Sequence, residues 1–169
     1  HIIENNLRTR DYTFDYEKQP SRAMFKYKQA FIRNDQERYM TFLNNVLQGK
    51  ATLHADNVAP YELIRPYMTW NWNGPSLETM SKSEKDALNA SWASLLDFCS
   101  DEDMLAVVDT SGSMHSSYGL PAAVALSLGL YLAEHNKGRF RNHFIEFSER
   151  PQLIRLKGET FVDKLRYIL

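Results

Sequence analysis

Apolar residues recur at helical spacing over much of the first hundred residues. Met24, Tyr27 and Phe31 fall on one face of a helix, and a second apolar stripe covers residues 39–47. Both stripes are rich in aromatic side chains, which are typical of a packed core. The pattern therefore predicts a helical region over residues 1–100.

The rest of this region has weaker patterns. Residues 1–20 show no clear period, but Tyr12, Phe14 and Tyr16 alternate with polar residues, which predicts a short extended arm. Pro60 opens a short helix, because a proline in the first turn loses no hydrogen bond. Residues 67–82 predict a loop that packs its two tryptophans on a neighbour. Residues 83–99 form an apolar stripe that predicts another helix, with Cys99 packed on its inner face.

A short β-branched run marks the change to a second kind of structure. Residues 105–108 predict a buried parallel strand, and the apolar segment 120–136 predicts a helix. Between them lie Asp109, Ser111 and Ser113. These three side chains are expected at the carboxyl end of a strand, which is where open α/β sheets place their ligands.

The remaining residues predict a small sheet. Residues 143–147 and 152–156 are short apolar runs joined by a turn, and they predict a hairpin. Thr160 caps a last helix with an apolar face. The fold class predicted is α/β, with residues 101–169 forming a parallel sheet that carries one antiparallel edge hairpin. We expect the helical region to pack on this half as one unit.

The loop between strand and helix suits a hard divalent cation. Asp109, Ser111 and Ser113 supply only oxygen, and Mg²⁺ takes about six oxygens while keeping several waters. In a structural alternative, the two serines simply cap the following helix. A hydrolase using either serine with His115 or His143 is a weaker hypothesis, because no residue fixes a base beside them. The glycines of a nucleophile elbow are absent.

The run Asp109-Thr110-Ser111-Gly112-Ser113 after an apolar strand resembles the metal-ion-dependent adhesion site of von Willebrand factor A (vWA) domains. This resemblance implies a non-enzymatic binding or scaffold protein with a Rossmann-like sheet. It also implies that a Mg²⁺ ion accepts a carboxylate from a protein partner. A complete vWA site adds a Thr and an Asp from later loops. We therefore expect weak or no Mg²⁺ binding by this chain alone, and completion of the sheet by a further segment or a second copy.

The helical part carries a second resemblance. Arg33-Asn34-Asp35 and Pro60-Tyr61-Glu62-Leu63 resemble an uncharacterised family in which a helical region precedes a vWA domain. That plan is distantly similar to the Ro/TROVE RNA-binding proteins. The alternative function is therefore RNA binding, with Arg22, Lys26 and Arg33 as the contacting residues. Steep loss of binding with added salt would favour this alternative.

The composition limits which binding partners and which cellular compartment are expected. The formal net charge is −1, so no global field attracts nucleic acid or acidic lipids. Cys99 is the single cysteine, so an intrachain disulfide cannot form and a reducing, cytoplasmic setting is expected. The longest apolar stretch, residues 120–133, is short for a membrane span, and no membrane partner is expected.

Overall fold

The computed structural model describes residues 2–68 and 74–169, so Trp70 and Trp72 lie outside the described residues. The chain divides into two compact units. The first, called the helical unit below, contains His1–Val58 and Met80–Leu96. The second, called the sheet unit, contains Ala59–Thr79 and Asp97–Leu169.

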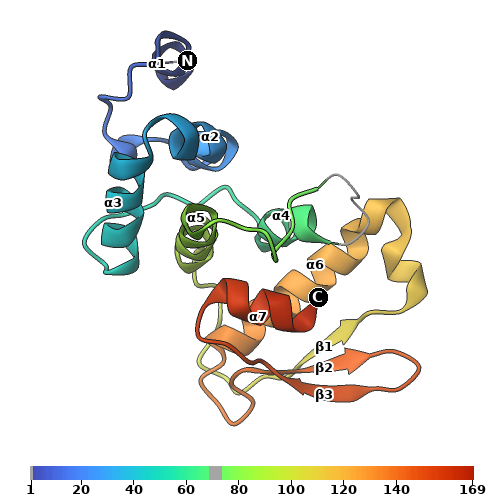
Figure 1. Ribbon diagram of the computed structural model, residues 1–169. Helices are drawn as coiled ribbons and strands as arrows, with labels where there is room; N and C mark the ends of the chain where they lie inside the picture. Colours follow the sequence, from blue (N-terminus) through green and yellow to red (C-terminus); the bar gives the residue numbers. More distant parts are fainter. Residues whose placement is uncertain (1, 69–73) are drawn as a thin grey trace. The chain divides into compact units, whose positions relative to one another are not determined.

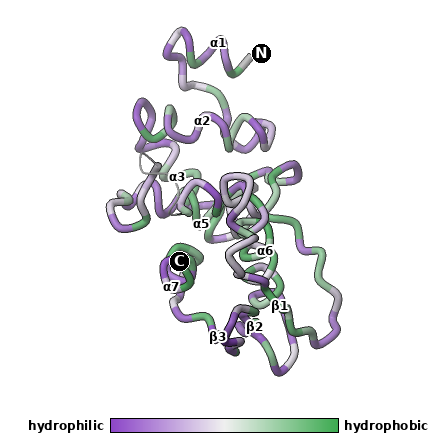
Figure 2. The backbone as a smooth tube through the Cα atoms, turned by 90° about the vertical axis from the view of Figure 1, so that its right-hand side faces the viewer, coloured by the Kyte–Doolittle hydropathy of each residue, from purple (hydrophilic) through white to green (hydrophobic). Residues whose placement is uncertain are grey.

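The helical unit is built from short amphipathic helices (Figure 1). Its elements are α1 (Ile2–Thr9), η1 (Tyr16–Lys18), α2 (Ser21–Asn34), α3 (Gln36–Leu47) and α5 (Lys82–Ala93). Hydrophobic and hydrophilic residues alternate along α2 and α3, as their apolar stripes predict (Figure 2). Helix α1 is not predicted by the pattern, because its eight residues are too few to show a period. The residues predicted as an extended arm lie outside α1, and the chain between α1 and η1 is not helical.

An aromatic cluster forms the core of the helical unit. Phe31 of α2 is fully buried, and its ring centroid lies 5.2 Å from that of Tyr16 and 5.3 Å from that of Tyr39. Tyr16 also stacks on Phe42 at 5.6 Å. The predicted role of these aromatics as core residues is therefore confirmed.

Helix α5 is shorter than the predicted helix over residues 83–99. It begins after Ser81, whose hydroxyl accepts from the Glu84 N–H while the Glu84 carboxylate accepts from the Ser81 N–H. It ends at Ala93, so Cys99 lies beyond the helix and is partly exposed. The prediction that Cys99 packs inside this helix is wrong, because local spacing does not show where a helix ends.

The sheet unit combines a small sheet with helices. Its elements are α4 (Pro60–Ile64), η2 (Arg65–Tyr67), β1 (Ala106–Asp109), η3 (Gly112–His115), α6 (Ser116–His135), β2 (His143–Phe147), β3 (Gln152–Arg155) and α7 (Phe161–Ile168). The strand order is β1-β2-β3. β1 pairs with β2 in parallel, and β2 pairs with β3 in antiparallel fashion. The mixed α/β class and the hairpin are thus confirmed.

Helix α6 connects the two parallel strands and packs closely on them. A β-carbon built on Gly129 would lie 2.2 Å from Val108 Cγ2, so only glycine lets the helix approach β1 this closely. At the other end, the buried Asn136 side chain donates to the Met104 carbonyl and accepts from the Gly138 N–H. The segment Gly112–His135 is long and apolar enough to cross a membrane by length and composition, and half of its most apolar window is buried.

One face of the sheet carries exposed apolar residues. Val107, Ile145 and Leu153 are register partners across the three strands, on the face opposite Val108 and Phe144. Val107 is 63% exposed and Leu153 57% exposed. Figure 1 shows α6 and α7 together over the other face. Among the described residues β1 pairs with β2 alone, and completion of the sheet by another segment or a second copy stays a prediction.

Candidate functional site

The predicted site residues lie on the loop that follows β1. Asp109 is the last residue of that strand and stands opposite Phe147 in the parallel register. The next residue, Thr110, donates its backbone N–H to the Phe147 carbonyl at 3.0 Å. The chain then turns through η3, which carries Ser113 and leads into α6. The three predicted oxygen donors therefore share one loop at the carboxyl end of the parallel strands.

The polar atoms of this loop point toward one another. The Asp109 Oδ1 atom accepts from the Ser111 backbone N–H at 2.8 Å, and the Ser111 Oγ lies 3.2 Å from the Ser113 Oγ. Hydrogen bonding by Ser111 lowers the pKa of the Asp109 carboxyl below its usual value; its hydroxyl has the larger effect and its backbone N–H the smaller one. The carboxylate is therefore ionised at neutral pH.

The structure does not show the two serines acting as helix caps. Ser111 occupies the N-cap position of η3, yet its side chain accepts no cap hydrogen bond from that helix. Helix α6 has His115 at its N-cap, again without a side-chain bond. The two serine hydroxyls instead bond to each other, and Ser111 is partly buried while Ser113 is exposed to solvent.

The donor set supplies three of the about six oxygens that Mg²⁺ takes, and one spacing within it matches such a site. Neighbouring ligands of an octahedral Mg²⁺ at about 2.1 Å lie about 3.0 Å apart, close to the 3.2 Å between the two hydroxyl oxygens. Asp109 would add the negative charge, and waters or a partner would fill the other positions. No group of three or more His, Cys, Asp or Glu side chains that could hold a metal occurs in the described part of the chain, so such a site depends on the hydroxyls.

The backbone after the loop is unusual. Ser117, Tyr118 and Gly119 all have positive φ angles, of 52°, 57° and 72°. A non-glycine residue in this region costs about 1–2 kcal/mol. The regular part of α6 therefore begins after Gly119, as the apolar pattern predicts, and the side chain of Tyr118 is 90% exposed beside the loop.

The predicted RNA-contacting residues lie on one helix. Arg22, Lys26 and Arg33 are all exposed on α2, at spacings that place them on one side of it. The Lys26 ammonium lies 5.0 Å from the Tyr27 ring, whose hydroxyl donates to Glu4. A carboxylate therefore stands close to this face. RNA binding through these residues stays a prediction.

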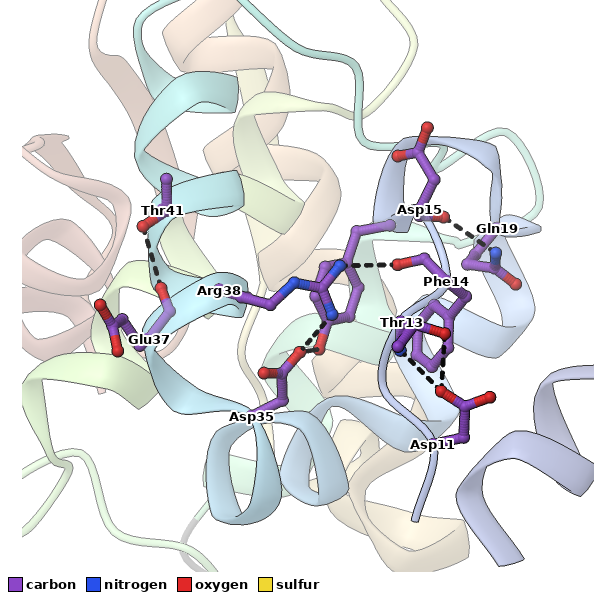
Figure 3. Close-up of polar contacts among 10 residues, drawn as sticks. Asp11, Thr13, Phe14, Asp15, Gln19, Asp35, Glu37, Arg38 and Thr41 are labelled. Carbon is purple, nitrogen blue, oxygen red and sulfur yellow. Dashed lines mark hydrogen bonds and ion pairs between the residues drawn. The ribbon is translucent and has the colours of Figure 1, made fainter. Parts of the chain in front are cut away.

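A cavity of about 540 Å³ opens in the helical unit beside α3. Figure 3 shows Arg38 of α3 between the Asp35 carboxylate and the Phe14 carbonyl, to which it donates at 3.0 and 2.9 Å. Glu17 in the cavity wall accepts from the Thr52 N–H at 2.7 Å. Arg38 therefore holds the N-terminal segment on α3 through Phe14, and Glu17 holds it on the segment that follows α3 through Thr52.

Sequence patterns missed a second cavity, of about 260 Å³, in the sheet unit. Its walls are apolar and come from α6, the sheet and α7: Leu126, Phe144, Ile154, Tyr167 and Ile168. Its polar groups are Thr110 and Glu146, and the Thr110 hydroxyl donates to Glu146 Oε1 at 2.9 Å. The residues involved are up to 58 positions apart, so no local pattern could have identified them.

The fold and the loop define a mixed α/β protein with a helical unit and an Asp-Ser-Ser loop at the end of a parallel strand. Residues 1–105 match the family model described as Domain of unknown function (DUF2828), and the chain belongs to that family. Residues 103–169 match a second model, described as Domain of unknown function (DUF7788). The two models meet just before β1.

Similar proteins add little about function. The chain is 28% identical to a protein of Acanthamoeba polyphaga mimivirus named "Uncharacterized protein L728", over 98% of this chain. It spans 30% of the length of that relative. No solved structure matches the chain.

Proposed function

We propose that the chain is a non-enzymatic binding protein whose vWA-like loop holds a Mg²⁺ ion through Asp109, Ser111 and Ser113. The observation that carries the proposal is the 3.2 Å separation of the two serine hydroxyls next to an ionised carboxylate. All three residues are partly or fully exposed, so a bound ion would remain accessible from solvent. The occupant of its open position would be an Asp or Glu carboxylate of a protein partner.

The chemistry of such a site sets the expected affinity. One carboxylate and two neutral hydroxyls leave Mg²⁺ with several waters and a net positive charge. Weak metal binding follows, and a partner carboxylate gains both a direct bond and charge neutralisation. The ion and the partner are therefore expected to bind together more tightly than either does alone.

Peptide selection tests this proposal. Peptides selected on the chain at saturating Mg²⁺ are expected to share an Asp or Glu, and chelation by EDTA should abolish their binding. Asp109→Ala removes the only carboxylate of the loop and should weaken binding at least about tenfold. The matched control Asp101→Ala removes an exposed carboxylate that pairs with Lys137, and it should have no effect.

Two results would contradict the proposal. Peptides that bind equally well in EDTA would show that the recognised surface does not need a metal. Equal weakening by both alanine substitutions would show that the effect of Asp109 is one of general surface charge. Circular dichroism of both variants establishes that each is folded.

A further inference from the structure

The cavity in the sheet unit is lined by apolar side chains together with the polar groups of Thr110 and Glu146. Phe144 and Leu126 are buried in its walls, at 2% and 7% exposure, and α7 contributes Tyr167 and Ile168. Its volume of about 260 Å³ exceeds the roughly 150 Å³ of an apolar cavity that binds benzene. A ring with a short polar group therefore fits the space.

Glu146 is the charged group of this cavity, and it has no counter-ion among the described residues. Its Oε1 atom accepts from the Thr110 hydroxyl at 2.9 Å, which leaves most of its acceptor capacity unused. Two lysines before and within α7 contact other groups. Lys164 pairs with Glu134 at 2.5 Å, and the Lys157 ammonium lies 5.1 Å from the Tyr167 ring.

We propose that this cavity binds a small amphipathic cation, in which an apolar ring or chain occupies the space under α7 and a protonated amine pairs with Glu146. Burial of the apolar part supplies the affinity, because the ring or chain moves out of water and into contact with aliphatic and aromatic side chains. The amine supplies the specificity, because a charged hydrogen bond to a half-buried carboxylate is stronger than a neutral one. This site uses none of the three residues proposed to hold metal.

The cavity nevertheless adjoins the loop. Thr110 lies in the cavity wall and is the residue between Asp109 and Ser111. Its backbone N–H bonds to Phe147, and its hydroxyl bonds to Glu146. Its amide resonance is therefore a natural reporter of an amine that approaches the carboxylate.

Benzylamine, compared with benzyl alcohol, is the probe we suggest. In NMR titrations of the isotope-labelled chain, benzylamine is expected to shift resonances of Thr110, Phe144 and Ile154. Benzyl alcohol, of the same shape without the charge, should bind at least about tenfold more weakly. Glu146→Gln keeps an oxygen for Thr110 and removes the charge, so it should abolish this preference.

Two further variants make the result specific. Glu149→Gln removes an exposed carboxylate from the β2–β3 turn and should leave the affinity for benzylamine unchanged. Ile154→Phe fills the cavity and should block both probes, with circular dichroism confirming the fold. Equal affinity for the two probes, an unchanged preference in Glu146→Gln, or shifts confined to residues outside the cavity would each overturn the proposal.

Discussion

Replacing Phe31 with alanine is expected to lower the free energy of unfolding of the helical unit by about 3–5 kcal/mol. The side chain is fully buried, and its ring contacts those of Phe14, Tyr16 and Tyr39 with centroids 5.2–6.0 Å apart. Truncation would remove apolar contacts and leave a cavity that three other rings cannot fill without moving. Urea unfolding followed by circular dichroism measures the change.

Phe25→Ala on the same helix is the matched control. Phe25 is only partly buried, and the Lys28 ammonium lies 5.1 Å from its ring. The same chemical change should therefore cost about 1 kcal/mol, since less apolar surface returns to water. Equal losses for the two variants would contradict the placement of Phe31 at the centre of the core.

Replacing Gly129 with leucine is expected to destabilise the sheet unit by about 3 kcal/mol. The first added carbon alone would overlap Val108 Cγ2, at 2.2 Å, and the rest of the side chain would push α6 away from β1. Leucine is a much better helix former than glycine, so intrinsic propensity favours the opposite result. Thermal or urea unfolding of the variant shows whether the clash with Val108 or the higher helix propensity of leucine has the larger effect on stability.

Gly112→Leu provides the comparison for this experiment. A β-carbon at Gly112 meets nothing within 4 Å, so the substitution should change the free energy of unfolding by no more than about 0.5 kcal/mol. A stable Gly129→Leu variant would show that α6 does not approach β1 as closely as the structure has it. The candidate loop would then lack a fixed position between them.

Much of the fold follows from local pattern. The apolar run before Asp109, the segment after Gly119 and the cap at Thr160 each predict the observed element. Residues 59–79 are different, because their sequence does not show that they belong to the sheet unit. That assignment depends on contacts between α4 and α6, which are far apart in the chain.

The candidate loop and the cavity also differ in how far the sequence alone predicts them. Asp109, Ser111 and Ser113 fall within five residues, so their shared loop could be predicted from spacing alone. The bond from Thr110 to Glu146 joins residues 36 positions apart and depends on the parallel pairing of β1 with β2. A sequence pattern reveals a local donor set, whereas a long-range contact needs the register of the sheet.

Paramagnetic relaxation by Mn²⁺ tests the metal-binding claim most directly, because it detects weak binding and reports its position. Substoichiometric Mn²⁺ should broaden the amide resonances of residues 109–113 before those of any other segment. Excess Mg²⁺ should reverse the broadening, and Asp109→Ala should remove it. Broadening that instead follows exposed carboxylates throughout the chain, or that persists at the loop in Asp109→Ala, would contradict a metal site formed by Asp109, Ser111 and Ser113.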